Sequence, residues 1–355
     1  MGVHFWEEPL FESAAEPWLR LNIDESGVRI LTPILPHTME RYEAGTVQQR
    51  LLDEYVNDRI RGGIVAWYYT PMALQFSGHL ETSTTVYDCM DELSAFMGAP
   101  PELMDWEQSL FKRADVVFTG GASLYAAKRT RHPNVHLFPS SVDKQHFASA
   151  RRPQPDPSDQ AAIPHPRIGF FGVLDERLDT ALLRDVAASH PEWHFVLIGP
   201  VVKIGENELP RGHNIHYLGR KDYSELPTYI ANWDLAMLPF ARNASTRFIS
   251  PTKTPEYLAA GKRVVSTPIQ DVVNPYGQIQ LVEIAGNSEE FGQAIARLLE
   301  PPEKDWIAKV DSLLSNMSWD MTVEGMLDEI AKCRLRKTAD SRKPSASLPR
   351  TGTHV

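Results

Sequence analysis

Short apolar runs alternate with helix-like segments along almost the whole chain, and this alternation restricts the fold more than any other feature. Runs such as GIVAWYYT at 63–70, DVVFTG at 115–120 and HFVLIGP at 194–200 have the length and composition of buried strands. Segments such as 45–61 and 101–113 lie between such runs and are predicted to be helices. Alternating strands and helices are typical of a parallel sheet with helices on both faces. The sequence therefore predicts an α/β fold of doubly wound, Rossmann-like sheets.

One proline-rich stretch interrupts this alternation. ARRPQPDPSDQAAIPHP at 150–166 holds five prolines and few periodic apolar residues, so we interpret residues 151–166 as an interdomain linker. The predicted parts are a first domain over 1–150, a second over 167–320, a last helix over 321–335 and a disordered basic tail over 336–355. Ligands of two-domain folds of this class bind at the carboxyl ends of strands, in the cleft between the domains.

The composition excludes several classes of protein. The 355 residues carry a formal charge of −10, which argues against nucleic-acid binding. The two cysteines, Cys89 and Cys333, are too few for a disulfide scaffold and belong to no zinc pattern. No apolar run is long enough to span a membrane, and the start of the chain does not resemble a signal peptide. We expect a cytoplasmic protein whose basic tail makes, at most, weak peripheral contact with the inner face of a membrane.

The stretch SPTKTPEYLAAGKRVVSTP at 250–268 is the richest candidate for ligand binding. Ser250 or Thr254 can cap the helix that starts there, and the free amides of a helix start favour an anion. Lys253 adds a positive charge, so the turn suits a diphosphate, and Glu256 could accept hydrogen bonds from two ribose hydroxyls. The alternative is an exposed ion pair between Lys253 and Glu256, with Glu256 only complementing the helix dipole.

A second candidate loop lies in FFGVLDERLD at 170–179. Gly172 would let a ligand approach the backbone, and Arg177 could bind phosphate with its planar fork of donors. The alternative is that Arg177 is bonded to Asp175 or Asp179. Neither a GxGxxG fingerprint nor a P-loop is present.

Two further sets of residues follow predicted strands. Asp88 and Asp91, in VYDCMDE at 86–92, could take a proton from an attacking hydroxyl. The alternatives are a helix cap, a solvated acid or, less favoured, a metal ligand. Tyr69 and Thr70 end the strand at 63–70, where an acceptor could meet them, although aromatic residues in such strands are more often core.

Two stretches, YLGRKDYSELPTYIANWDLAMLPFARN and SPTKTPEYLAAGKRVVSTPI, resemble the nucleotide-binding half of GT-B glycosyltransferases. The resemblance is closest to bacterial group 1, family 4-like enzymes that build cell-surface polysaccharides. It is specific over about 167–275 and looser over most of the remaining chain. It implies two Rossmann-like domains facing a cleft and a glycosyltransferase of the hexosyltransferase type.

The resemblance also implies substrates and residue roles. The donor would be a UDP- or GDP-linked sugar, the acceptor a hydroxyl of a saccharide or lipid-linked saccharide, and no metal or other cofactor would be needed. Glu256 matches the ribose-binding glutamate, Gly172 and Arg177 match the first donor-domain loop, and Asp88 or Asp91 matches the catalytic base of inverting relatives. The last helix would cross back to the first domain. The diphosphate-binding loop would comprise Ser250, Thr252, Lys253 and Thr254.

The sequence departs from the family pattern in two ways. Phe248 stands where retaining members carry the first glutamate of an E-x7-E motif, so the resemblance does not imply a retaining mechanism. Relatives also begin with a strand and a glycine-containing loop before HFWEEP, so we expect a first domain truncated at its start. The alternatives are a nucleotide-sugar epimerase on the same fold and a catalytically impaired nucleotide-sugar-binding protein.

Overall fold

The computed structural model describes residues 2–40 and 42–341, and contacts within the chain divide it into two compact units. Unit 1 comprises 1–87 and 102–115, and unit 2 comprises 88–101 and 116–355. This division does not fall at 151–166, where the proline-rich stretch suggested a boundary. The domain ranges 1–150 and 167–320 therefore stay a prediction.

Unit 1 is built around one buried strand, β4 (Arg29–Pro36). It pairs in parallel with β1 (His4–Trp6) and β2 (Leu10–Glu12), and antiparallel with β3 (Trp18–Ile23). Leu31, Ile34 and Leu35 of β4 are at most 2% exposed and form part of the core. The other elements of unit 1 are α1 (Ala44–Arg59), β5 (Val65–Tyr68), η1 (Pro71–Ala73), α2 (Leu74–Ser77), β6 (Thr84–Cys89, which ends in unit 2) and α3 (Leu103–Arg113), with β5 and β6 parallel.

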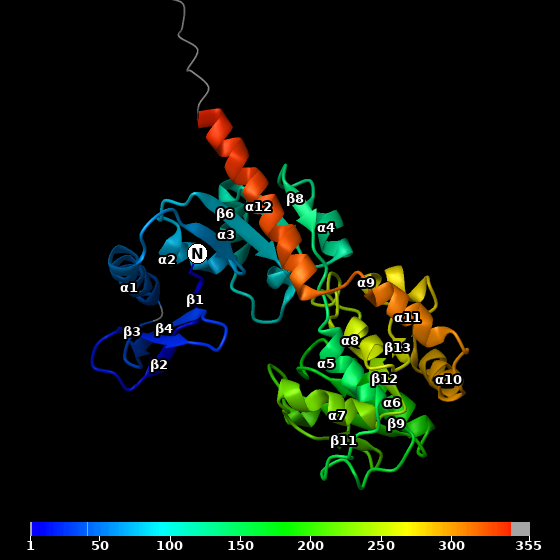
Figure 1. The fold of residues 1–355 in the computed structure, drawn as a ribbon. Coiled ribbons are helices and arrows are strands. Elements are labelled where there is room, and N and C mark those ends of the chain that lie inside the picture. Colours follow the sequence, from blue (N-terminus) through cyan, green and yellow to red (C-terminus); the bar gives the residue numbers. More distant parts are fainter. Residues whose placement is uncertain (1, 41, 342–355) are drawn as a thin grey trace, which may run out of the picture. The chain divides into compact units, whose positions relative to one another are not determined.

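Unit 2 contains a six-stranded parallel sheet in the order β11-β10-β9-β12-β13-β14. Figure 1 labels four of its strands, β9, β11, β12 and β13. Its strands are β9 (Arg167–Phe171), β10 (His194–Ile198), β11 (Ile215–Tyr217), β12 (Leu235–Leu238), β13 (Val264–Ser266) and β14 (Val282–Ile284). Numbered along the chain, this order is 3-2-1-4-5-6, the order of a Rossmann fold. The strand order reverses between β9 and β12, so the carboxyl ends of these two strands mark the expected ligand site. The predicted α/β class with parallel, doubly wound strands is confirmed.

Local sequence signals explain why the helices of unit 2 form where they do. Asp179 accepts a hydrogen bond from the Leu182 amide (2.9 Å) and so caps α6 (Thr180–Ser189). Asn287 caps α10 (Ser288–Leu299) in the same way, and these two helices pack against each other.

The remaining elements of unit 2 are η2 (Leu93–Ala95), β7 (Val116–Thr119), α4 (Ala122–Lys128), β8 (Val135–Leu137), α5 (Lys144–Ala148), η3 (Ser149–Arg151), η4 (Glu206–Glu208), η5 (Tyr223–Glu225), α7 (Leu226–Ala231), α8 (Lys253–Ala259), α9 (Gln270–Val272), η6 (Val273–Gly277), α11 (Trp306–Leu314) and α12 (Trp319–Ser341).

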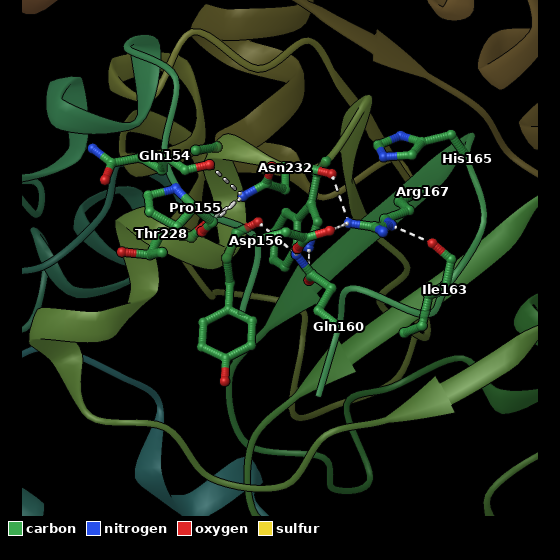
Figure 2. A network of polar contacts seen from close by, with 12 residues as sticks. Gln154, Pro155, Asp156, Gln160, Ile163, His165, Arg167, Thr228 and Asn232 are labelled. Carbon is green, nitrogen blue, oxygen red and sulfur yellow. Dashed lines mark hydrogen bonds and ion pairs between the residues drawn. The ribbon is translucent and has the colours of Figure 1, made fainter. Parts of the chain in front are cut away.

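The proline-rich stretch before β9 is bound to unit 2 by a buried polar network (Figure 2). Arg167 is 2% exposed, and its guanidinium donates to Asp156 Oδ2 (2.7 Å) and to the carbonyl of Ile163 (2.8 Å). Gln160 is fully buried, donates to Asp156 Oδ1 (3.1 Å) and accepts from Trp233 Nε1 (2.9 Å). A buried cation requires such partners, so this stretch packs against the start of β9, and its role as an interdomain linker stays a prediction.

The last helix is longer than predicted. α12 begins at Trp319 and continues to Ser341, so residues 336–341 are helical and not disordered, while the predicted tail at 342–355 lies outside the described residues. No helix within 2–40 and 42–341 is both long and apolar enough to cross a membrane.

Candidate functional site

Lys253 lies against the carboxyl end of β9, at the point where the strand order reverses. It is the first residue of α8, and a Cβ atom placed on Gly172 would lie only 2.2 Å from its Cε. Gly172 also has a φ of +142°, so the loop after β9 needs glycine for both its conformation and its contact with the lysine. Gly172 and Lys253 thus lie next to each other, and their shared role in binding a ligand stays a prediction.

The Lys253 ammonium has no anionic partner among the residues that the structure describes. Its Nζ lies 5.9 Å from the ring centroids of Phe170 and Phe171, and it makes no hydrogen bond or ion pair with any described residue. Burial lowers the pKa of Lys253, and the charge of Arg177 acts in the same direction, while Glu256 opposes the shift. An unpaired, partly desolvated cation at the end of a strand is suited to hold an anion.

Glu256 lies one helical turn after Lys253 and is also unpaired. Its Oε2 is buried and has no hydrogen-bond partner among the described residues, so the ion pair with Lys253 that the spacing allowed is not formed. Burial raises the pKa of Glu256 to about 7, against the opposing charge of Lys253. A buried oxygen without a donor costs about 1–3 kcal/mol, and a ligand hydroxyl would remove that cost.

Arg177 forms an ion pair with Asp175, one of the two partners that the alternative interpretation of this loop named. Its Nε donates to Asp175 Oδ1 (3.0 Å) and its Nη2 donates to Oδ2 (2.7 Å), and Asp175 is 4% exposed. Burial alone would lower the pKa of Arg177, but the hydrogen bonds and charge of Asp175 outweigh it and the pKa is raised. Nη1 donates to no residue in the described chain, so one face of the fork is available to a ligand.

The two candidate bases, Asp88 and Asp91, have different environments in the structure. Asp88 is the fifth residue of β6 and is 3% exposed. Asp91 follows the strand, makes no side-chain hydrogen bond with the residues that the structure describes, and interacts electrostatically with Arg177 and Lys253. Burial raises the pKa of Asp91, and those two cations act to lower it. Of the pair, Asp91 is therefore the acid that shares a site with the two cations.

Sequence reasoning missed the contacts that fix the loop after Asp91. Met97 donates its amide to Glu176 Oε1 (3.2 Å), and Ser245 donates its hydroxyl to the carbonyl of Ala95 (2.9 Å). The Phe96 ring lies 5.5 Å from the Arg177 guanidinium carbon. Acids on either side of Arg177 indicate partners for the arginine itself, but no local pattern indicates the contacts of residues 95–97.

The other predicted site residues have the following places. Thr252 is the N-cap residue of α8 but makes no side-chain capping bond, so the expected capping by Ser250 or Thr254 is wrong. The Thr254 hydroxyl is buried without a partner in the described part of the chain. Ser250 lies beside Gly121. In unit 1, Tyr69 is 52% exposed and Thr70 caps η1 by accepting the Met72 amide (3.3 Å), so their acceptor role stays a prediction.

Comparison with known proteins finds a family model that matches the segment carrying most of this site. Residues 165–301 match the family model of the glycosyl transferases group 1. A Bacillus subtilis (strain 168) protein named as the teichuronic acid biosynthesis glycosyltransferase TuaH is 27% identical over an alignment of 234 positions, which covers 61% of this chain and 59% of that protein. The match thus spans less than two thirds of the length of this relative.

Solved glycosyltransferase structures share the fold. Sucrose-phosphate synthase from Thermosynechococcus elongatus has a TM-score of 0.68 at 15% identity, over 96% of this chain and 90% of that one. The UDP-forming α,α-trehalose-phosphate synthase from Burkholderia xenovorans, in complex with glucose-6-phosphate, has a TM-score of 0.58 at 15% identity, over 96% and 92%. At such identities the likeness shows the fold alone, and that fold is GT-B, with two Rossmann-like domains.

Proposed function

We propose, from the premise that residues 165–301 are a group 1 glycosyltransferase domain, that this protein is a glycosyltransferase. It moves a sugar from a nucleotide-diphosphate sugar to a hydroxyl acceptor. The observation that carries this proposal is the unpaired state of Lys253 and of Glu256 Oε2 beside the end of β9. A cation and a carboxylate one turn apart, neither bonded to the other, match the diphosphate and the ribose of one ligand.

Lys253 and Arg177 both bind the diphosphate in this proposal. Lys253 and Arg177 repel each other, since the charge of Arg177 lowers the pKa of Lys253. A diphosphate between the Lys253 ammonium and Arg177 Nη1 relieves this repulsion, and Ser250, Thr252 and Thr254 line the same turn. Glu256 accepts hydrogen bonds from the ribose hydroxyls, and Gly172 leaves room for the ligand at the backbone.

The proposed reaction uses Asp91 as the general base. Asp91 takes the proton of the acceptor hydroxyl as its oxygen bonds to the anomeric carbon, and the bond from that carbon to the diphosphate breaks. Lys253 and Arg177 stabilise the charge that develops on the departing nucleoside diphosphate. The raised pKa of Asp91, caused by burial, makes it a stronger base than a solvated aspartate.

We place this activity in the synthesis of cell-surface polysaccharide or glycolipid, in the cytoplasm. The name of the Bacillus subtilis relative supports a polymer of this kind. The acceptor is a saccharide or a lipid-linked saccharide, which Tyr69 and Thr70 contact. The donor is UDP- or GDP-linked, and the UDP-forming Burkholderia xenovorans synthase, which shares the fold, makes UDP-sugars the first to test.

Release of nucleoside diphosphate tests the proposal. The protein is incubated with UDP- and GDP-sugars, with and without a panel of p-nitrophenyl glycosides and a bacterial lipid extract. Release that depends on the acceptor is the expected result. An epimerised nucleotide sugar formed without acceptor would indicate an epimerase, and donor binding without either product would indicate an impaired binder; each of these results would overturn the proposed transfer.

A further inference from the structure

A cavity of about 310 Å³ lies where α4 meets α9, two helices of unit 2 that are in contact (Figure 1). It is lined by Ala122, Ser123, Ala126, Gln270, Asp271 and Asn274. None of these residues belongs to the donor turn or to the residues assigned to the acceptor. We call this space the α4–α9 cavity, and its volume is at the lower end of the range of small-molecule sites, about 300–1,000 Å³.

Asp271 supplies a buried carboxylate that lacks hydrogen-bond donors. The residue is 5% exposed, and its Oδ1 accepts a hydrogen bond from the Ser123 amide (2.9 Å). Burial raises the pKa of Asp271, and the amide and side chain of Ser123 oppose this shift. Even so, Asp271 Oδ2 and the Ser123 hydroxyl are both buried and form no hydrogen bond of normal geometry with any residue in 2–40 or 42–341. Buried polar atoms of this kind are destabilising unless a ligand or water becomes their partner.

Small residues on α4 and just before it shape the cavity. A Cβ atom on Gly121 would lie 2.2 Å from Asp271 Oδ2 and 2.8 Å from the Cβ of Ser250, so only glycine lets this segment approach Asp271 so closely. Ala122 and Ala126 lie one turn apart on α4 and carry only a methyl group each. These small side chains leave the space beside the carboxylate open to a ligand.

The lining residues favour a neutral ligand with several hydroxyl groups. Asp271 is the only charged residue of the six, so the cavity does not attract an anion. Gln270 and Asn274 are exposed, and their carboxamides make no hydrogen bond with the described residues, so each can both donate and accept. A carboxylate alone would also suit an ammonium group, but the hydroxyl and the two carboxamides beside it match adjacent hydroxyl groups.

We propose that the α4–α9 cavity binds one sugar ring of a saccharide. Asp271 Oδ2 accepts a hydrogen bond from one sugar hydroxyl, the Ser123 hydroxyl pairs with a second, and Gln270 and Asn274 bind those at the rim. The methyl groups of α4 contact the apolar face of the ring. This site goes beyond the proposed transfer, because a sugar can bind there without a nucleotide sugar.

Saturation-transfer NMR on the full chain tests this site. The probes are methyl glycosides of glucose, galactose and N-acetylglucosamine, added without nucleotide sugar, so the result does not depend on the proposed transfer. We expect one of them to bind the unmodified protein. Ala126→Phe fills the cavity and should abolish this binding. Ala127→Phe changes the next residue of the same helix, which is exposed and does not line the cavity, and should bind like the unmodified protein.

Two further variants test the polar groups. Asp271→Ala removes the carboxylate and should weaken binding of the glycoside at least about tenfold, and Ser123→Ala, which keeps the amide, should weaken it about fivefold. Circular dichroism checks the fold, and the two phenylalanine variants decide the question if Asp271→Ala unfolds. The proposal is wrong if no glycoside binds the unmodified protein, as when only water occupies the cavity. It is also wrong if Ala126→Phe and Ala127→Phe bind alike, or if ethanolamine binds and no glycoside does.

Discussion

The pKa of Glu256 makes donor affinity depend on pH in a way that can be calculated. Burial raises the pKa of Glu256 to about 7, whereas a solvated glutamate titrates near 4.5. With that pKa, the carboxylate is about 10% ionised at pH 6 and about 90% ionised at pH 8. If ribose hydroxyls require the ionised form, affinity for a nucleotide sugar should rise about tenfold between these two pH values.

Isothermal titration calorimetry with a UDP- or GDP-sugar measures this dependence. A nucleotide sugar is a suitable ligand because its diphosphate, esterified at both ends, does not titrate in this range. Glu256→Gln should bind more weakly at pH 8 and lose the rise with pH, because glutamine has no proton to release. Constant affinity from pH 6 to 8 in the unmodified protein, or the same rise in Glu256→Gln, would refute the assigned role of Glu256.

The same shift makes a prediction for stability in the absence of ligand. The folded state holds the Glu256 proton more tightly than the unfolded state, because the folded pKa is about 7 and the reference value is 4.5. Between these values the folded state binds more protons, so the contribution of this group to stability is present at low pH and is lost as pH rises towards 7. The melting temperature of the unmodified protein should fall relative to that of Glu256→Gln over this range.

Three further substitutions test separate parts of the structure. Gly172→Ala places a Cβ against Lys253 Cε and should weaken donor binding at least about tenfold by calorimetry, whereas Gly62→Ala, also at positive φ but with open space around it, should not. Asp156→Ala leaves the buried Arg167 without its carboxylate and should cost about 3–5 kcal/mol of unfolding free energy in urea. The control Asp311→Ala, in an exposed pair, should cost about 0–1 kcal/mol. Asp91→Asn should lower turnover about 10²–10⁴-fold with donor affinity unchanged; retained turnover would exclude Asp91 as the base.

The strands could be predicted because they depend on local patterns of apolar residues. Glycine, lysine and glutamate near the ends of β9 and β12 indicated a ligand site, and the binding of a donor there stays a prediction. The contact of Gly172 with Lys253 followed from topology, since the carboxyl ends of neighbouring parallel strands meet at one edge of the sheet. The capping of α8 was mispredicted because the helix begins at Lys253, so Thr254 lies inside it and Ser250 lies before the N-cap residue Thr252.

The remaining features depend on burial, which residue type alone does not reveal. Asp156 and Gln160 are polar and lie among prolines in the predicted linker, and no local pattern indicates that they form a buried network with Arg167. Asp175 was only one of two possible partners for Arg177, and its buried position makes it the actual one. The place of Phe96 beside Arg177 depends on contacts between segments about eighty residues apart, which periodicity does not detect.

Calorimetric titration of UDP- and GDP-sugars into matched lysine variants tests the proposed donor site most directly. Lys253→Ala removes the unpaired cation beside β9. Lys309→Ala removes a surface lysine on α11 that pairs with Glu303. We predict that one of these nucleotide sugars binds the unmodified protein and Lys309→Ala alike, and that Lys253→Ala binds it at least about tenfold more weakly. Equal affinity in all three proteins would contradict the assignment of Lys253 and its turn to the donor diphosphate.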